Sequence, residues 1–576
     1  MGSFVSALVG SAKLVKIALG ALYEQYLQFR ELDARINQPP GLPRPSPTRS
    51  FWLEDPPYPE LVDIQSAELP VQADVVIIGS GITGVAVAWS LLAEHAEKTE
   101  EKTSMSPPPR VVVLEARQLC SGATGRNGGH IKASPHETMA MLVHKFHVPA
   151  ARAAALVRFQ LAHLDHLLGL CAAEPGLQAV AECREVETVD LFVDAARFRE
   201  GQEGVALVKQ WVPEFPMHIW TASEAQEAMG PHVVGAISYR AGALWPYRLV
   251  TSLWKRLLEA HPHALFLETS TPVEAVEVGP PGQNGHNIQK GDDGDAAFPY
   301  RIVTPRGVVH ARHVVHATNA FTSQFLPQLR RKTTGLRAHM SAQRPGAHFP
   351  DLNGQRSWSI IIGAGFDYIT QRPTVTTTDT SGHTQRRPGM VMAGGGFTRS
   401  ANQGLDQFAV YDDTDLDLLT ATHLHGMLPA TFAPFWGPDD GAGGSLERGQ
   451  GHVESMWTGI VAVTGDTLPL VGRLDDPLTE RPPPTSSSSS ARRHRRVRPL
   501  EDSGEWISAS YAGDGMVWAW LCGTAVGLMV AGRDQEALPP RPGRPAGRVC
   551  DWLPPELLAT HDRLRKIDVS DLSALF

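Results

Sequence analysis

Cysteine is scarce in this sequence, and long apolar runs are absent. The 576 residues include five cysteines, which form no C-x-x-C pair and no closely spaced even set. A disulfide framework is therefore not expected, and a reducing compartment, most simply the cytoplasm, is predicted. Because no apolar run is long enough to cross a bilayer, no transmembrane segment is predicted, and no cleaved signal is recognisable.

The sequence also lacks an excess of positive charge. Its 52 Lys and Arg residues are outnumbered by 61 Asp and Glu residues, which gives a formal net charge of -9. This balance offers no electrostatic footprint for nucleic acid, so no nucleic-acid partner is predicted. The one basic run, residues 492–496, follows a serine run inside residues 475–500, which are predicted to be a disordered insert.

No group of residues has the spacing of a metal site. His310, His313 and His316 recur every third residue, but their segment has the pattern of a β-strand. Side chains alternate between the two faces of a strand, so the middle histidine is expected on the opposite face from the other two. No metal ligand is therefore predicted.

The N-terminal residues 1–38 are predicted to form an amphipathic helix. An apolar stripe from Phe4 to Phe29 recurs at helical spacing, and polar residues that include Lys13 and Lys16 gather on the other side. The two lysines interrupt the stripe, which agrees with a helix that lies against a surface and does not span a bilayer.

The first six residues, Met-Gly-Ser-Phe-Val-Ser, match the myristoylation pattern at Gly2 and Ser6. Two interpretations of the helix stay open: lipid or peripheral membrane attachment, and a helix docked on the body of the protein. Residues 39–70 then form a proline-rich connector to the first predicted strand.

A glycine motif follows that connector. The apolar run Val75–Ile78 is typical of a buried parallel strand, and Gly79, Gly81 and Gly84 come directly after it at G-x-G-x-x-G spacing. Such glycines allow a tight turn, backbone approach to a pyrophosphate, and close packing of a helix on the strand. Residues 85–92 continue as an apolar helix, whose N-terminus favours negative charge. The pattern predicts a bound dinucleotide.

A second strand and a glycine-rich loop support this prediction. Val111–Leu114 is a further buried strand that ends on Glu115, a carboxylate suited to a ribose diol. The polar residues 94–110 explain the long interval between the glycines and this strand as a surface insertion. Residues 120–130 then contain four glycines within eight residues, which lets backbone amides approach the same ligand.

Together these stretches resemble the FAD-dependent oxidoreductases of the D-amino-acid oxidase superfamily, nearest the branch of glycine and sarcosine oxidases and gamma-glutamylputrescine oxidoreductase. Three further stretches, Val308–Ala320, Trp457–Gly472 and Ser510–Ala525, resemble the family's flavin-side strand, its segment under the flavin ring, and its glycine turn before a helix. The resemblance implies an α/β protein in which a Rossmann-type FAD-binding domain with a parallel sheet is interleaved with an α+β substrate domain built on an antiparallel sheet.

The resemblance also implies how the chain is divided. The expected FAD-binding parts are residues 71–135, 241–330, 456–474 and 501–535. The expected substrate parts are residues 136–240 and 331–455, and residues 536–576 form a C-terminal tail. The expected strands over the flavin face are Arg337–Gln343, Phe366–Gln371 and Met390–Phe397, with polar loops at Gly279–Phe298 and Thr374–Pro388.

Cofactor-binding residues are carried over from the family's motifs to the matching positions of this chain. They are Gly79, Ser80, Gly81, Ile82, Thr83, Gly84, Glu115, Ala116, Ser121, Gly122, Thr124, Arg126, Asn127, Gly128, Gly129, His130, Val273, Thr318, Asn319, Ala320, Asp466, Gly513, Gly515 and Met516. Members that hold FAD through a cysteine carry it near the start of the Trp457 segment, where this chain has Ser455 and Met456, so a non-covalent FAD is expected.

The implied reaction is oxidation of the C–N bond of an amine or amino acid, with hydride transfer to the flavin and hydrolysis of the resulting imine. Residues expected to aim the substrate are His130, Tyr368, Arg399 and Trp457, with Arg372 as a further candidate; for each, a salt bridge or core packing is the alternative. The electron acceptor stays open between oxygen and another carrier, as does the oligomeric state. Two alternatives keep the same cofactor motifs: action on a non-amine substrate, and flavin binding without amine oxidation.

Overall fold

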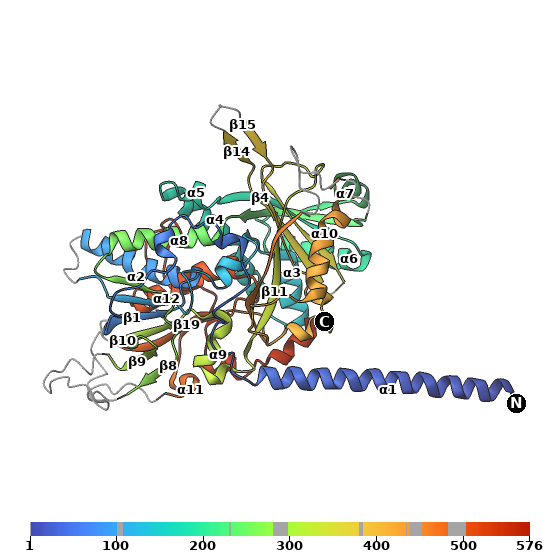
Figure 1. Cartoon of the computed structure of the whole chain (residues 1–576), viewed down its shortest axis with the longest axis horizontal. Coiled ribbons are helices and arrows are strands. Elements are labelled where there is room, and N and C mark those ends of the chain that lie inside the picture. Colours follow the sequence, from blue (N-terminus) through green and yellow to red (C-terminus); the bar gives the residue numbers. More distant parts are fainter. Residues whose placement is uncertain are drawn as a thin grey trace.

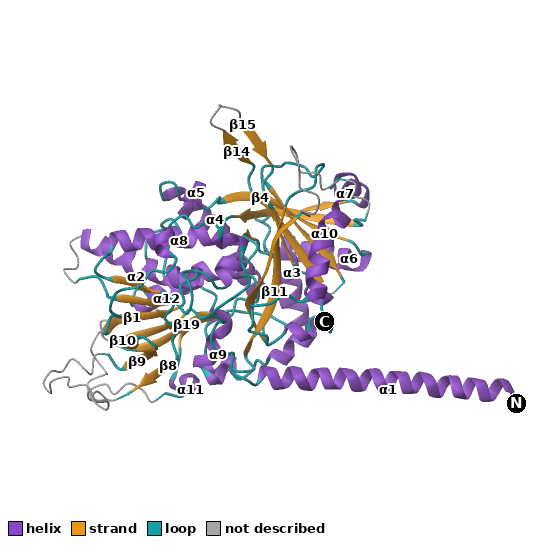
Figure 2. Cartoon of the chain, viewed as in Figure 1, coloured by secondary structure: helices purple, strands orange, loops and turns teal. Residues whose placement is uncertain are grey.

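The computed structural model describes residues 2–100, 107–229, 232–279, 298–363, 365–378, 384–433, 435–437, 452–481 and 503–575, with the backbone alone for 2–12, 94–100, 377–378, 384–385 and 574–575. Two large sheets organise the body of the protein, and helices cover them (Figures 1 and 2). The predicted α/β fold with one parallel and one antiparallel sheet is confirmed.

The first sheet, sheet A, has the order β18-β19-β10-β1-β2-β7. The pairs from β19 to β7 are parallel, while β18 and the hairpin partners β9 and β8 are antiparallel. Its strands are β1 Gln72–Ile78, β2 Val111–Leu114, β7 Leu265–Glu268, β8 Ala275–Val278, β9 Tyr300–Thr304, β10 Gly307–His316, β18 Leu470–Arg473 and β19 Gly504–Ala509. Because helices cover it, β2 is buried along its whole length and reads as a continuous apolar run.

Helices α2 Ile82–Glu100, α8 Pro246–Ala260 and α12 Ala519–Val530 pack beside this sheet. Glycines let α12 approach α2 closely. A Cβ at Gly523 would lie 2.8 Å from the Cβ of Ala86, and one at Gly527 would lie 2.6 Å from the Cβ of Ser90. The contact of these two helices therefore fixes how the last motif of the chain sits against the first.

The second sheet, sheet B, has the order β17-β11-β16-β13-β12-β4-β6-β3, with β5 on β6. All its pairs are antiparallel except β12 with β4. Its strands are β3 His130–Ile131, β4 Arg184–Phe192, β5 His218–Trp220, β6 Gly235–Ala243, β11 Thr333–Gln343, β12 Arg356–Ile362, β13 Gly365–Gln371, β16 Val391–Gly394 and β17 Val453–Thr464. The three strands predicted over the flavin face are thus β11, β13 and β16.

Further helices flank sheet B or join the two sheets (Figure 2). They are α3 Pro135–Ala140, α4 Ala150–Ala173, α5 Leu177–Val180, α6 Ala195–Trp211, α7 Ala222–Met229, α9 Thr322–Phe325 and α10 Leu418–Phe432. The longest, α4, buries Phe159 and His163 in the core, and Nε2 of His163 accepts a hydrogen bond from the Leu521 N–H of α12. Helix α4 therefore links β4 of sheet B to α12 beside sheet A.

Two expectations about inserts are wrong in part. Thr374–Pro388, expected as a loop, contains the hairpin β14 Val375–Thr378 and β15 Thr384–Arg387, because its β-branched residues favour strands despite their polarity. The expected disordered segment 475–500 begins with helix α11 Asp476–Thr479. Arg481 then donates to Glu505 at 2.6 Å, a long-range pair that no local pattern announces. Residues 482–502, with the basic run, lie outside the described residues, as do 280–297.

The two chain ends behave differently. The C-terminal residues include α13 Val549–Trp552 and α14 His561–Leu564, and Arg563 binds both carboxylate oxygens of Asp466 at 2.9 and 3.0 Å. The expected tail is thus part of the packed body. At the other end, α1 Gly2–Ile36 contains the predicted amphipathic helix and projects from the body (Figure 1). Within the described residues, no helix combines the length and apolar character needed to cross a membrane.

Candidate functional site

The glycine motif forms a turn that tolerates no side chain at its three glycine positions. Gly79 has φ +110°, and a Cβ there would lie 2.5 Å from the carbonyl oxygen of Ala317. A Cβ at Gly84 would lie 2.1 Å from the carbonyl oxygen of Gly79, and one at Gly81 would lie 2.8 Å from Oγ1 of Thr124. The three glycines are therefore required by backbone approach, as the motif predicts.

Ser80 locks this turn to the neighbouring strand. Its hydroxyl donates to Oε2 of Glu115 at 2.7 Å and accepts from the backbone N–H of Cys120 at 2.8 Å. Its carbonyl oxygen accepts from the indole N–H of Trp254 at 2.9 Å. Glu115 is thereby held at the carboxyl end of β2, next to the turn, where the sequence predicts a ribose contact.

The side chain of Arg126, which is only 3% exposed, holds the glycine-rich loop in place. Nε of Arg126 donates to the carbonyl oxygen of Thr458 at 2.6 Å, and its Nη2 donates to the hydroxyl of Thr48 at 2.7 Å. Burial lowers the pKa of Arg126 to about 10. Its Nη1 is buried and has no hydrogen-bond partner among the described residues.

Trp457 supports the same loop and has no accessible surface. Its indole N–H donates to the carbonyl oxygen of Arg126 at 2.8 Å, and its exposed fraction is 0%. Since a ligand touches only accessible surface, Trp457 acts on the site by holding the loop. The expectation that it aims the substrate directly is replaced by a positioning role.

Tyr368 on β13 closes the loop from the side of sheet B. A Cβ at Gly128 would lie 2.3 Å from the Tyr368 ring, and one at Gly394 would lie 2.5 Å from its Cζ. The ring therefore occupies a slot between two glycines, and its hydroxyl lies 2.9 Å from Sδ of Met340. Burial raises the pKa of Tyr368, and the charge of Asp514 raises it further, so the phenol stays protonated.

His130 and Lys132 enter the site from β3 and the residue after it. Nε2 of His130 is 2.9 Å from the hydroxyl of Ser357, and burial lowers the pKa of His130 to about 3, so the ring is neutral. Nζ of Lys132 donates to Asp190 and, at 2.5 Å, to the hydroxyl of Ser359. In extended chain, residues two apart share a face, which places both side chains against sheet B.

Lys132 and Asp190 form a buried ion pair, with side chains that are 10% and 1% exposed. The second carboxylate oxygen of Asp190 accepts from the hydroxyl of Tyr239 at 2.7 Å, and Nε2 of His136 lies 3.6 Å away. Burial raises the pKa of Asp190, but Lys132 and His136 outweigh it and hold that pKa below its usual value. Buried charges of this kind persist because each is paired and hydrogen-bonded.

Asp514 stands in the turn between β19 and α12. Burial raises its pKa to about 7, although the Lys132 ammonium lowers it; Glu137 raises it further. The residue is nevertheless exposed, and the mutual charge effects show that it lies near Tyr368 and Lys132. A carboxyl group that titrates near neutrality at such a place is typical of functional sites.

The predicted cofactor-binding residues divide by accessibility. Those with accessible surface are Gly79, Gly81, Glu115, Ala116, Gly122, Asn127, His130, Thr318, Asn319, Asp466, Gly513 and Gly515. Those that are buried are Ser80, Ile82, Thr83, Gly84, Ser121, Thr124, Arg126, Gly128, Gly129, Val273, Ala320 and Met516. Residues of the first group have the larger accessible surface toward which a ligand could bind.

Three predicted positions are engaged elsewhere or lie at the surface. Both oxygens of Asp466 accept from Arg563. Arg372 pairs with Glu182 at 2.6 Å and stacks on an aromatic ring, while Arg399 is exposed after β16. The pattern of charge along the sequence could not distinguish Arg372 from a substrate ligand or Asp466 from a cofactor ligand, because their partners are distant in the chain.

Lys132, Asp190 and Asp514 are residues of the site that the sequence reasoning missed. For two of them, the sequence contains a feature that could have indicated the role. Lys132 follows His130 by two residues in an extended segment, and Asp514 stands between the predicted Gly513 and Gly515. Asp190 had no signal of its own, because its role depends on pairing with Lys132 across sheet B.

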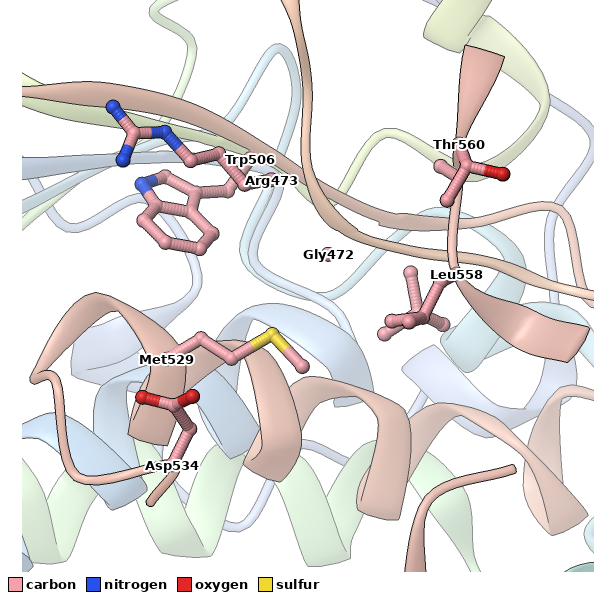
Figure 3. A pocket seen from close by; sticks show the side chains of 9 residues that line it. Gly472, Arg473, Trp506, Met529, Asp534, Leu558 and Thr560 are labelled. Atoms are coloured by element: carbon pink, nitrogen blue, oxygen red, sulfur yellow. The ribbon is translucent and has the colours of Figure 1, made fainter. Parts of the chain in front are cut away.

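A pocket of about 290 Å³ lies at a different place (Figure 3). It is lined by Arg473, Trp506, Met529, Asp534 and Leu558 among others. Trp506 is near the start of β19, which runs parallel to β1, so the pocket is at the amino ends of the strands. Ligands of such sheets bind at the carboxyl ends, where the glycine turn lies. The pocket is therefore separate from the predicted site.

The site fits a dinucleotide on grounds of its own geometry. The turn after β1 has three positions at which a Cβ would fill the backbone cradle, and α2 begins directly behind it. Glu115 lies next to the turn, where it is placed for a ribose, and it keeps accessible surface. These residues would hold a pyrophosphate and an adenosine at the edge of sheet A. Among the described residues, no cluster of three or more potential metal ligands occurs.

Comparisons with solved structures give the same fold. Glycine oxidase from Geobacillus kaustophilus superimposes with a TM-score of 0.51 at 15% identity, covering 81% of this chain and 96% of that one. L-amino acid deaminase from Proteus vulgaris gives 0.51 at 15%, covering 84% and 96%. Iminodiacetate oxidase from Chelativorans sp. BNC1 gives 0.50 at 12%, covering 80% and 95%. No curated protein matches the chain.

The family described as FAD dependent oxidoreductase matches residues 74–527, which include the glycine turn, the glycine-rich loop and the turn at Asp514. This match covers most of the chain and includes both the first and the last motif of the predicted cofactor site. The chain therefore belongs to the FAD-dependent oxidoreductase family of D-amino-acid oxidase type, and its cofactor is FAD.

Proposed function

We propose that the protein oxidises the C–N bond of an amine or amino acid. In this reaction a hydride leaves the carbon beside the nitrogen, the nitrogen lone pair forms the imine bond, and water hydrolyses the imine. FAD, when bound, accepts the two electrons of the hydride. The observation that carries the proposal is the group of Tyr368, Lys132 and Asp514, which lies where the carboxyl end of β19 faces sheet B.

The charges of this group suit a substrate that must lose a proton before it is oxidised. An ammonium group has no lone pair to form an imine, so the amine has to be neutral when the hydride leaves. The pKa of Asp514 is about 7, so its carboxylate is available near neutral pH to take that proton. His130 is neutral and the charge of Lys132 is balanced by Asp190, so neither disfavours a neutral amine.

The names of the structural neighbours support a nitrogen-containing substrate. Two are called oxidases of glycine and of iminodiacetate, and one is called an L-amino acid deaminase. At 12% to 15% identity these likenesses carry the fold alone. The proposal for this chain therefore rests on its own site, and the choice between an amine and an amino acid is made by experiment.

An amino acid and a simple amine differ in the cation that the site has to supply. An amino acid brings a carboxylate, which needs a cation such as the exposed Arg399 or the ammonium of Lys132. Lys132 is already paired with Asp190, so a carboxylate that used it would compete with that buried pair. A simple amine requires no such exchange. FAD is proposed to be held without a covalent bond, since Ser455 and Met456 precede Trp457.

The test is the visible spectrum of the purified protein under anaerobic conditions, before and after acid precipitation. We expect a yellow protein that releases its colour into the acid supernatant, because the flavin is not covalently held. Primary amines, secondary amines and amino acids are then added in turn, and one class is expected to bleach the flavin. Readmitted air distinguishes an oxidase from a dehydrogenase by how fast the colour returns.

A matched variant links the result to the site. Asp514→Asn keeps the shape of the side chain and removes its titration, so bleaching should become slower near neutral pH and recover at higher pH, where the amine is neutral in solution. A yellow protein that no amine or amino acid bleaches would favour the alternatives, a non-amine substrate or flavin binding without amine oxidation.

A further inference from the structure

Helix α1 stands apart from the rest of the protein. It spans Gly2–Ile36 and projects from the body along the long axis, with the N-terminus at its far end (Figure 1). Its contacts with the body come from its last turns. Gln28 donates to Asn402 at 3.2 Å, Arg35 donates to the carbonyl oxygen of Leu405 at 2.8 Å, and Asp33 pairs with Arg331 at 2.5 Å.

The free part of α1 exposes large apolar side chains. Between residues 14 and 29, the exposed members include Leu14 at 68%, Leu22 at 61%, Tyr23 at 62% and Phe29 at 53%. At about 100° per residue, the face from Leu14 to Tyr23 covers about half of the circumference. Exposed apolar surface of this extent on a soluble chain marks an interaction surface.

The charges on this helix have the opposite sign to those of the whole chain. From Lys13 to Arg30 there are three basic residues, Lys13, Lys16 and Arg30, and one acidic residue, Glu24. The whole sequence carries a net charge of -9. A helix with an apolar face and basic residues beside it fits the surface of an anionic bilayer, in which the apolar side chains enter the acyl boundary.

A second copy of the helix fits less well. Val15, Leu19, Leu22, Tyr26 and Phe29 are spaced alternately by four and three residues, as in a coiled-coil seam. The positions that flank this seam, however, are Lys16, Ala18, Tyr23, Gln25 and Arg30. They contain two basic and no acidic residues, so two copies would gain no flanking ion pairs. A two-stranded seam is also narrower than the apolar face, and it would leave Leu14 uncovered.

We propose that α1 attaches the enzyme to an anionic membrane surface, with the face around Leu22 in the acyl boundary and Lys13 and Lys16 near the lipid phosphates. The enzyme then works at the membrane as a peripheral protein. This inference concerns the chain's location and is independent of the substrate that the proposed function assigns.

The experiment measures how the full-length, FAD-loaded protein partitions onto vesicles. Vesicles of phosphatidylcholine alone are compared with vesicles of phosphatidylcholine and phosphatidylserine by co-sedimentation. We expect binding to the second kind. Leu22→Gln should reduce the partition coefficient by about tenfold or more, because a leucine side chain is no longer buried. Glu24→Gln introduces the same residue on the polar face and should leave binding unchanged or tighter.

The charge contribution is measured with Lys13→Gln and Lys16→Gln. Each should weaken binding to the anionic vesicles by about fivefold and leave binding to phosphatidylcholine alone unaffected. The flavin spectrum and melting temperature of each variant, expected to equal those of the parent, show that the body is intact.

Three results would overturn the proposal: no partition onto either kind of vesicle, equal partition of the parent and Leu22→Gln, or a self-associated species in sedimentation velocity that Leu22→Gln abolishes while vesicles bind nothing. The last would assign the face to a second copy of the chain.

Discussion

The two sides of the proposed active site are specified in different ways. On the side of sheet A, the three glycines of the turn stand within six residues, and a Cβ at each would lie between 2.1 and 2.8 Å from a neighbouring atom. On the side of sheet B, Lys132, Asp190 and Tyr239 come from three strands or their ends, and charge and hydrogen bonding hold them together. The first side is therefore local and steric, and the second is long-range and electrostatic.

The largest expected effect comes from disrupting the Lys132–Asp190 ion pair on the side of sheet B. Lys132→Met leaves Asp190 as a buried, uncompensated carboxylate, so it should lower the free energy of unfolding by about 3–5 kcal/mol. Urea denaturation monitored by tryptophan fluorescence measures the change. The double variant with Asp190→Asn removes both charges and should recover much of the loss. Equal stability of Lys132→Met and the parent would show that the pair is not a buried ion pair.

A single added methyl group should disrupt the glycine turn on the side of sheet A. Gly84→Ala places a Cβ 2.1 Å from the carbonyl oxygen of Gly79, so helix α2 has to move away from the turn. We expect a loss of about 1–3 kcal/mol and a protein that is purified without FAD, as measured by thermal unfolding and the visible spectrum. The matched control is Gly169→Ala on α4, where a Cβ has nothing within 4 Å. That variant should stay yellow and be slightly more stable, because alanine favours helix.

A smaller change tests whether a buried residue joins the two sides without touching substrate. Trp457→Phe keeps an aromatic ring but removes the N–H that binds the carbonyl oxygen of Arg126. The expected cost is about 1 kcal/mol of stability, with the relative rates of flavin bleaching by different substrates unchanged. Chemical denaturation and anaerobic stopped-flow spectroscopy provide the two readouts. A changed substrate preference would restore Trp457 as a substrate contact.

The difference between the two sides also explains how far the sequence could be interpreted. The strand and the glycines lie in one short pattern whose steric requirements can be read from the sequence, Glu115 ends the next predicted strand, and the structure places them together. Asp190 and Lys132 are 58 residues apart, and nothing around either residue indicates the other. Arg372 and Asp466 were expected at the site, yet their partners Glu182 and Arg563 are 190 and 97 residues away.

Partners that are distant in the chain also explain the order at the start of the insert that was predicted to be disordered. Residues 475–481 lie in a segment of low predicted order, but Arg481 is held by Glu505 and by the carbonyl oxygens of Val276 and Phe325. Composition describes a segment in isolation, whereas order at these positions comes from pairs that form only in the folded chain. The fold class and the cofactor edge could therefore be predicted, and the electrostatic half of the site could not.

The smallest expected effect concerns Asp514, where the two sides meet. Its pKa in the folded protein is about 7, raised by burial from the usual 3.8. Between about pH 4 and 7 the folded state holds a proton that the unfolded chain has lost, so this group makes stability fall as the pH rises through that window. Asp514→Asn imitates the protonated form at every pH and removes the fall.

The melting temperatures of the flavin-free parent and Asp514→Asn should therefore agree near pH 4 and separate as the pH increases, with the variant higher by a few degrees at pH 8. Glu137→Gln is an informative companion, because Glu137 raises the pKa of Asp514 and its loss should move the window toward lower pH. Parallel pH curves for the parent and Asp514→Asn would mean that Asp514 is fully solvated. The electrostatic coupling of Asp514 to Lys132 and Glu137 would then be contradicted, while the glycine turn and the Lys132–Asp190 pair would be unaffected.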